Sequence, residues 1–362
     1  MDLAKHKRVF LIISDLHYSY KNKDSRVDYK GEIGHVLDKI ITLIDDYKNK
    51  GYSVCLIFLG DIIDNSFKSM QEGINFNNYF VYFEAVCEKV YSVVGNHEMS
   101  YYKDNPFWCL FSKIESPKLK NVLTRSWQPQ GTLQLVNIVD YIELGDTILH
   151  FNHHAVPTAK PIEGKINIGL FHKDIVSKAI VEDMQQNLGL DIFEGRPSYI
   201  ESTPVVQSYD YCYFGHLHKI YGEWVYTNDN TGKETRLNYL ASLGRPNHSE
   251  VQNNFLERDI PAIVFDESNN FKEVEHNKFN LLEREACVLE HIIVEKQRKY
   301  KENKEKQKLV NYNASSDNPI QNITSALADN YELLYLFDTY VNSEINLEER
   351  DLLNNIEDVL RY

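Results

Sequence analysis

Short apolar runs that each end at a cluster of polar side chains limit the fold of this chain more than any other feature of its sequence. The runs are rich in Val, Ile and Phe, as buried β-strands are. Between the first three runs, apolar residues recur at helical spacing within 33–44 and 80–90. Such alternation predicts an α/β fold, whose ligands bind just beyond the carboxyl ends of the strands. The runs are 9–14, 54–59, 90–94, 166–171 and 211–214.

The pattern changes at about residue 133, after which strands follow one another without long helices between them. We expect these later strands to form a second sheet packed on the first, with helices on the outer faces of this two-sheet sandwich. The later runs are 133–139, 147–152, 222–226, 237–240 and 262–265.

Beyond residue 280 the chain is rich in Leu, Glu, Lys and Asn, and helices are expected at 281–309 and 331–360. The polar segment 311–322 contains Pro319 and is typical of a linker. We therefore predict one domain over residues 1–275 and a helical C-terminal region over residues 276–362.

Composition narrows the class of protein. The 362 residues are 43% hydrophobic and 25% charged, as in globular proteins. The five cysteines show no CxxC spacing, so they indicate core residues in a reducing compartment. No apolar run approaches the roughly 20 residues of a membrane span, and we expect a cytoplasmic protein without membrane contact. A net charge of −14 argues against a surface that coats nucleic acid, although a local basic groove or bound metal would supply positive charge.

The polar clusters carry the ligands of a metal site. Asp15 and His17 are two residues apart at a strand end, where alternation points both side chains the same way. Asp61 follows the next strand, and the two oxygens of a carboxylate can bridge two cations about 3.5 to 4 Å apart. We therefore expect Asp61 to bridge two metal ions.

Asn96 and His97 follow the third strand and have different expected roles. Asn96 offers a neutral carbonyl oxygen to a metal. His97 projects in another direction, so it suits a hydrogen-bond donor near a phosphate. With Asp61, His97 is the predicted catalytic residue.

The remaining nitrogen ligands follow the last two strands of the first set. His216 and His218 repeat the two-residue spacing, and Gly215 is expected to allow a tight turn before them. His172 ends the fourth run and is the favoured third histidine. The alternatives are His150, which lies in the run 147–152, and His153 and His154, which follow that run.

Together these residues predict a binuclear site. Oxygen and imidazole ligands without thiolate suit Mn, Fe, Zn or Mg ions rather than a structural zinc. Two such cations activate a water and neutralise phosphoryl oxygens, which points to hydrolysis of a phosphate ester, with His97 protonating the leaving alkoxide. A single such cluster would most simply be an ordinary turn. The prediction of a metal site rests on the occurrence of all the clusters at strand ends in one chain. The expected ligands are Asp15, His17, Asp61, Asn96, His172, His216 and His218.

The ordered motifs resemble those of the calcineurin-like metallophosphoesterases. The matching residues are Asp15-x-His17, Gly60-Asp61-x-x-Asp64, Gly95-Asn96-His97-Glu98, His172 and Gly215-His216-x-His218. The resemblance implies one metal held by Asp15, His17, Asp61 and His218, and another held by Asp61, Asn96, His172 and His216. It also implies that His97 aids the transition state. The first motif differs from those of protein Ser/Thr phosphatases and of purple acid phosphatases.

Within this superfamily, residues 239–250 resemble the Tyr-x-Gly-Ser segment of SbcD-type DNA repair nucleases, a group that includes phage recombination endonuclease subunits. Ala241 replaces the usual glycine. The resemblance covers about residues 8–270. It implies activation by Mn²⁺, DNA as substrate, a homodimer, and an SbcC-type coiled-coil ABC ATPase as partner. The basic end of the 281–309 helix is compatible with such contacts, and packing on its own domain would explain that helix equally well.

Three functions stay open at the level of sequence. Segment 239–250 favours a DNA exo/endonuclease acting in recombination or repair. The acidic net charge favours a small-molecule phosphoesterase acting on cyclic nucleotides or nucleotides. A non-catalytic interaction protein on the same fold is disfavoured, because no expected ligand is missing.

Overall fold

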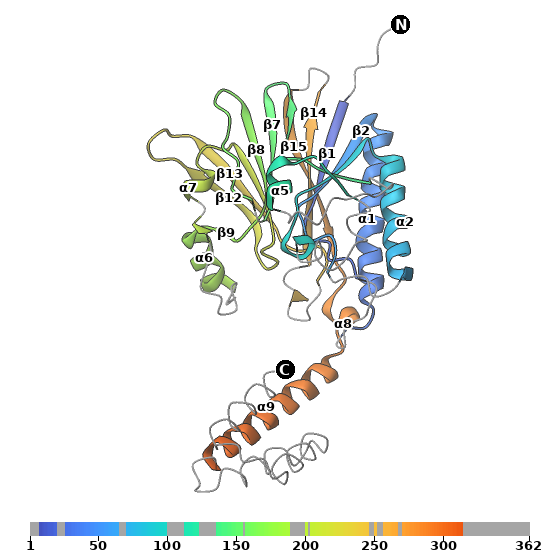
Figure 1. The fold of residues 1–362 in the computed structure, drawn as a ribbon, viewed down its shortest axis with the longest axis vertical. Coiled ribbons are helices and arrows are strands. Elements are labelled where there is room, and N and C mark those ends of the chain that lie inside the picture. Colours follow the sequence, from blue (N-terminus) through green and yellow to red (C-terminus); the bar gives the residue numbers. More distant parts are fainter. Residues whose placement is uncertain are drawn as a thin grey trace, which may run out of the picture. The chain divides into compact units, whose positions relative to one another are not determined.

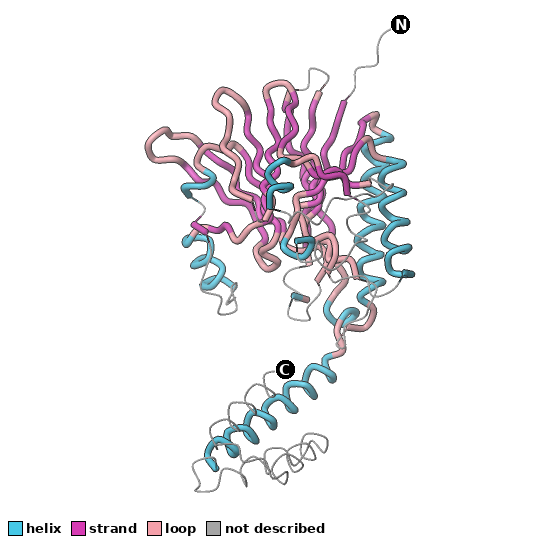
Figure 2. The backbone as a smooth tube through the Cα atoms, in the orientation of Figure 1, coloured by secondary structure: helices cyan, strands magenta, loops and turns pink. Residues whose placement is uncertain are grey.

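The computed structural model describes residues 7–19, 26–64, 70–99, 112–122, 135–154, 156–188, 200–201, 203–245, 250–251, 256–266 and 270–313. The chain divides into two compact units, Met1–Leu289 and Glu290–Tyr362. The first unit carries two large sheets with helices, as Figures 1 and 2 show.

The first sheet has seven strands in the order β15-β14-β1-β2-β3-β5-β4. Strands β1, β2, β3, β5 and β4 run parallel to one another. Strand β14 pairs antiparallel with both β1 and β15. The bounds are β1 (Lys7–Ile13), β2 (Tyr52–Phe58), β3 (Lys89–Ser92), β4 (Ser112–Ile114), β5 (Val136–Ile138), β14 (Glu257–Phe265) and β15 (Phe271–Asn280).

The second sheet has six strands in the order β12-β13-β11-β8-β7-β6. The four central strands are parallel, and an antiparallel strand closes each edge. The bounds are β6 (Tyr141–Leu144), β7 (Thr147–Asn152), β8 (Ile166–His172), β11 (Tyr211–Gly215), β12 (Tyr221–Thr227) and β13 (Glu234–Leu240). A separate pair is formed by β9 (Ile175–Val176) and β10 (Ile200–Glu201).

Successive side chains of each strand point to opposite faces of its sheet, so apolar residues form one layer between the two sheets and further layers outside them. In β1, Val9 and Leu11 pack toward the helices of the first sheet, whereas Phe10 and Ile12 pack in the core between the two sheets. A third apolar cluster lies beneath α6 on the outer face of the second sheet. The predicted α/β two-sheet sandwich with helices on its outer faces is therefore confirmed.

The helices follow from their apolar faces and caps. Helix α1 begins after Asp28, whose side chain accepts the N–H of Gly31 at 3.0 Å, and it buries Ile33 and Leu37 against the first sheet. Helix α2 lies beside α1 in Figure 1. The bounds are α1 (Tyr29–Asn49), α2 (Met70–Val86), α5 (Pro117–Val122), α6 (Lys178–Leu188), α7 (Thr203–Val206), α8 (Arg284–Cys287) and α9 (Glu290–Asn313).

Several expectations differ from the structure. The runs at 133–139 and 262–265 supply β5 and β14, which join the first sheet rather than the second. Strands β6 and β15 were not expected, because they are short or largely exposed and show little apolar alternation. Helix α6 was not expected either, although its 11 residues are clearly amphipathic. No helix among the described residues is long and apolar enough to cross a membrane.

The C-terminal boundary also differs from the expected position near residue 275. Strand β15 pairs with β14 through Asn280, and the first unit continues to Leu289. The expected helix at 281–309 is interrupted at Val288, whose backbone is extended, so that α8 and α9 are separate. Helix α9 runs to Asn313, into the expected linker; the rest of that linker and the helix at 331–360 lie outside the described residues.

Candidate metal centre

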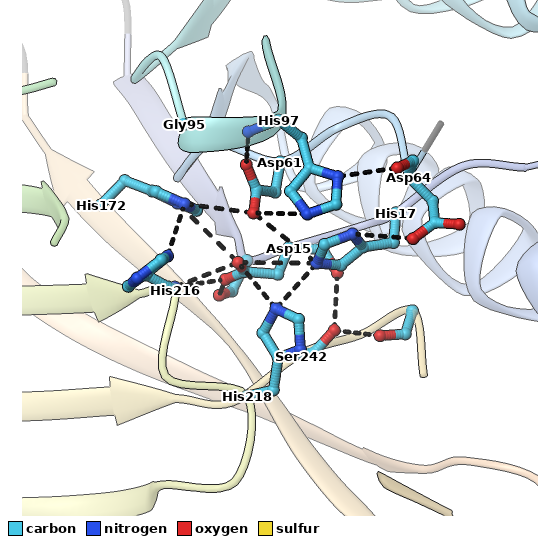
Figure 3. A network of polar contacts seen from close by, with 12 residues as sticks. Asp15, His17, Asp61, Asp64, Gly95, His97, His172, His216, His218 and Ser242 are labelled. Carbon is cyan, nitrogen blue, oxygen red and sulfur yellow. Dashed lines mark hydrogen bonds and ion pairs between the residues drawn. The ribbon is translucent and has the colours of Figure 1, made fainter. Parts of the chain in front are cut away.

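The carboxyl ends of β1, β2, β3, β8 and β11 bring the predicted residues from both sheets into one cluster (Figure 3). Asp15 and His17 follow β1, Asp61 follows β2, and His97 follows β3. His172 is the last residue of β8. His216 and His218 follow β11, which pairs with β8. Parallel strands thus deliver the polar side chains to one edge, as their order in the sequence predicted.

A first group of possible metal ligands consists of Asp15, His17, Asp61 and His218, whose ligand atoms all lie within 4.8 Å of one another. The Nε2 atoms of His17 and His218 face each other at 2.8 Å. His218 Nε2 lies 3.6 Å from Asp15 Oδ1, and His17 Nε2 lies 3.8 Å from Asp61 Oδ2. Ligands held about 2.1 Å from one cation lie roughly 3.0 Å apart when adjacent and up to about 4.2 Å apart when opposite. The separations of 3.6 and 3.8 Å fit that range, and the His17–His218 pair at 2.8 Å would have to open slightly to share a metal.

A second group consists of Asp61, His172 and His216. His172 Nε2 lies 3.3 Å from Asp61 Oδ2 and 3.0 Å from Asn96 Oδ1. His216 Nδ1 lies 3.1 Å from the same His172 nitrogen. Asn96 therefore adds a fourth ligand atom to this group, and the two groups match the division that the family resemblance implied. Coordination by these residues stays a prediction.

Asp61 belongs to both groups, but through one oxygen rather than two. Its Oδ1 accepts the backbone N–H of His97 at 2.9 Å. Its Oδ2 faces His17 in the first group and His172 in the second. If Asp61 bridges two ions, Oδ2 is the oxygen that would face both groups, and the contact of Oδ1 with the His97 N–H orients it.

His97 lies at the edge of both groups. Its Nδ1 lies 2.7 Å from the backbone oxygen of Asp64, which can only accept, so Nδ1 carries the proton and donates it. Its Nε2 faces Asp61 Oδ2 at 3.9 Å, and its side chain is 30% exposed. His17, Asp64 and His97 also form a third group of nearby ligand atoms. The orientation of Nε2 toward the open side of the cluster suits contact with a substrate.

Left-handed backbone conformations place the ligands. Residues other than glycine adopt positive φ at Asp15 (39°), His17 (48°), Asp61 (46°) and His216 (74°). Such conformations are unfavourable for these residue types and persist where surrounding structure imposes them. The expectation that strand alternation aligns Asp15 and His17 was wrong, because both lie beyond the end of β1. Their shared direction comes from the left-handed turns.

Gly215 serves close packing rather than the turn expected of it. It lies within β11, and the left-handed residue is His216. A Cβ atom at Gly215 would lie 2.6 Å from Asp15 Oδ2 and 2.9 Å from the Leu59 backbone oxygen. The absence of a side chain lets the two sheets approach at the metal ligands.

Glu98 contacts the backbone of the site and lies outside the ligand groups that the described residues form. Its buried carboxylate accepts backbone N–H groups of Asp61, Ile62 and Gly95 at 2.7 to 2.8 Å. Burial raises its pKa to about 7. Sequence reasoning quoted Glu98 in the third motif but gave it no role; its position beside Asn96 and His97 was the available signal.

Electrostatics keeps the carboxylates of the cluster ionised. Burial alone would raise the pKa of Asp61, but His172 and His17 outweigh it and hold the pKa below its ordinary value. Burial opposes charge on His172 as well, yet Asp61 and Asp15 raise its pKa to about 9. Burial lowers the pKa of His17 to about 3, which leaves a neutral imidazole. Divalent cations bind anionic oxygens and neutral imidazole, so a cation bound at the second group would have to displace the proton that the carboxylates favour on His172.

The structure separates His172 from its alternatives. His153 uses both ring nitrogens in the core, since Nδ1 accepts the Val94 N–H at 3.0 Å and Nε2 donates to Val139 O at 3.1 Å. His150 pairs with Asn167 Oδ1. The His154 ring lies beside those of His172 and His216, outside the ligand groups found among the described residues.

Fold and site together define a metal-dependent phosphoesterase, with a cluster suited to two divalent ions. The chain belongs to the calcineurin-like phosphoesterase family, whose model matches residues 8–220 and so includes every predicted ligand. No curated protein matches the chain.

Among solved structures, a 5′-nucleotidase precursor from Thermus thermophilus is similar at 12% identity and a TM-score of 0.39. The alignment covers 82% of this chain and 59% of that one.

Proposed function

We propose that this protein is a two-metal phosphodiester hydrolase of the SbcD type that cleaves DNA in recombination or repair. In this proposal it works with Mn²⁺ and with an SbcC-type coiled-coil ABC ATPase, and it forms a homodimer. The family and the site define a phosphoesterase, and the proposal adds its substrate, metal and partner.

The backbone at Ala241 is the observation that carries the nuclease assignment. The SbcD-type nucleases have glycine at this place in the Tyr-x-Gly-Ser segment, and Ala241 has φ of 55°, a conformation that glycine adopts easily. The same segment lies against the site, because Ser242 Oγ donates to the Asp15 backbone oxygen at 3.0 Å and Gly244 N–H donates to it as well. The backbone at Ala241 therefore has the conformation that a glycine at this position would favour.

The chain's own residues have separable roles in the proposed reaction. The two ligand groups would hold the cations, and bound cations would supply a nucleophile from water at neutral pH and neutralise phosphoryl charge. Asp61 Oδ2 sets the position of both groups relative to each other. Asp64 O holds the Nδ1 proton of His97, so it is in the doubly protonated form that His97 would donate Nε2–H to a phosphoryl oxygen or pass that proton to the leaving alkoxide.

A second function, hydrolysis of small phosphodiesters, is favoured by the net charge of −14, which disfavours approach of DNA. Some of the basic charge expected to contact DNA is also neutralised within α9. Arg298 pairs there with Glu295 at 2.8 Å and with Glu302 at 2.9 Å.

The deciding experiment gives purified full-length protein with Mn²⁺ three substrates: labelled linear DNA, bis(p-nitrophenyl) phosphate and a cyclic nucleotide. Asp61→Ala should abolish cleavage. His97→Ala should retain both ions and lower kcat by about 10² to 10⁴-fold. His276→Ala is the matched control, since this imidazole pairs with Asp259 in the β14–β15 hairpin. Cleavage of small diesters but never of DNA, even with a candidate ATPase present, would refute the nuclease proposal and support the second function.

A further inference from the structure

The two histidines of the Gly215–His218 turn present different ring nitrogens to the two ligand groups. His216 faces the second group through Nδ1, which lies 3.1 Å from His172 Nε2. His218 faces the first group through Nε2, which lies 2.8 Å from His17 Nε2. Each ring therefore leaves its other nitrogen pointing away from the ligands.

A carboxylate meets each of those outward nitrogens. His216 Nε2 lies 2.8 Å from Asp174 Oδ1, and His218 Nδ1 lies 3.2 Å from Glu250 Oε1. Neither carboxylate belongs to a ligand group among the described residues. Asp174 lies two residues after His172, and Glu250 lies at the end of segment 239–250. The contact through which each carboxylate can influence a metal is therefore the imidazole that it meets.

The other imidazoles of the cluster have neutral or more distant partners on their outward nitrogens. His172 Nδ1 lies 2.5 Å from the Leu59 backbone oxygen, and His97 Nδ1 donates to the Asp64 backbone oxygen. His17 Nδ1 is 3.7 Å from Asp64 Oδ1, beyond hydrogen-bonding distance. Contact with an anionic oxygen at hydrogen-bonding distance thus distinguishes His216 and His218, one in each ligand group.

We propose that Asp174 and Glu250 are positioning residues, each of which sets the affinity of one of the two metal ions by fixing the ring nitrogen that its histidine presents. This inference rests on the proposed two-metal function. A carboxylate on the outward N–H fixes the imidazole tautomer and makes the inward nitrogen a better ligand. Asp174 acts on the second group through His216, and Glu250 acts on the first group through His218.

The two effects should differ in size. The Glu250 side chain is 8% exposed, whereas that of Asp174 is 40% exposed. Water can replace the exposed partner more readily, so Asp174→Ala should weaken its ion about 10-fold and Glu250→Ala its ion up to about 100-fold. In each variant the other ion should bind as in the wild type.

The test is a titration of full-length protein with Mn²⁺, followed by calorimetry and electron paramagnetic resonance. Wild type should bind two ions and show the exchange-coupled signal of a metal pair. Each variant, at Mn²⁺ concentrations that saturate one site only, should show the signal of an isolated ion. Asp174→Asn, which keeps an acceptor oxygen, should restore part of the lost affinity. Asp259→Ala removes a carboxylate from the His276 pair and should bind Mn²⁺ as wild type does.

A double-mutant cycle identifies the ion concerned. Asp174→Ala should change nothing further in a His216→Ala background, and Glu250→Ala should change nothing further in a His218→Ala background. Two ions in wild type with unchanged affinities in both variants would overturn the inference and leave the proposed function intact. Loss of both ions together in either variant would also overturn it, because it indicates general disruption. A wild-type protein that binds no ions would refute the proposed function itself.

Discussion

The assignment of His153 to the core, rather than to the metal site, can be tested quantitatively. The ring is buried and uses both nitrogens, accepting from Val94 N–H through Nδ1 and donating to Val139 O through Nε2. Burial lowers its pKa to about 4 from the ordinary 6.5. Protonation would place a charge in the core and remove the acceptor for Val94, so the folded protein resists it.

The pKa shift sets the pH range and the size of the effect. Between pH 6.5 and 4 the unfolded chain binds a proton at His153 that the folded chain does not, so stability falls as the pH falls through this range. From pH 7 to pH 5 the loss from this residue is about 2 kcal/mol. His153→Gln keeps one donor and one acceptor but cannot titrate, so the variant should lack this part of the wild-type loss.

The assay is urea-induced unfolding of chelator-treated wild type and His153→Gln at pH 7 and pH 5. We expect the wild type to lose about 2 kcal/mol more than the variant over this interval. In the same preparations, His153→Gln should take up two Mn²⁺ ions and His172→Ala should take up fewer. Equal pH dependence in wild type and variant would refute the ionisation argument. Loss of metal from His153→Gln would show that the core assignment is wrong.

Two further substitutions probe the shared oxygen and the close approach of the sheets. Asp61→Asn should weaken both ions together, because one oxygen faces both groups; a Mn²⁺ titration that lost only one ion would contradict the bridging position. Gly215→Ala should destabilise the fold by about 1 to 3 kcal/mol and weaken the ion of the first group, since the added Cβ meets Asp15 Oδ2. Urea unfolding and the same titration would measure both effects, and an unchanged protein would show that the contact relaxes freely.

The sequence predicted the parallel core of each sheet because its strands are apolar on both faces. Strand β7 was predicted with its observed bounds, and β1, β2 and β8 within one or two residues. The hairpin of β14 and β15 was harder to place, since β15 alternates exposed and half-buried residues and its partner strand gives no sign of which sheet it joins. Sheet membership depends on packing between distant segments, which local periodicity does not record.

In the site, the ligand types were predictable and their orientation was not. Asp and His at strand ends indicate metal binding by chemistry alone. The left-handed conformations at Asp15 and Asp61 come from constraints that distant segments impose, such as the contact of Glu98 with the Asp61 N–H. Asp174 carries no spacing signal toward His216, because the two meet only through the pairing of β8 with β11.

Because β14 lies beside β1, the first sheet cannot be completed during synthesis until a segment far along the chain has been made. Strand β1 pairs with β14, from Arg8 with Phe265 to Leu11 with Ala262. The edge of β1 that β14 covers therefore stays unpaired until the ribosome has passed residue 265. The family match ends at residue 220, after the last predicted ligand. A nascent chain of that length would hold every candidate ligand while exposing the unpaired backbone of an apolar strand, an edge prone to aggregation. Chaperone protection should therefore be needed most between the synthesis of the last ligand and that of β14.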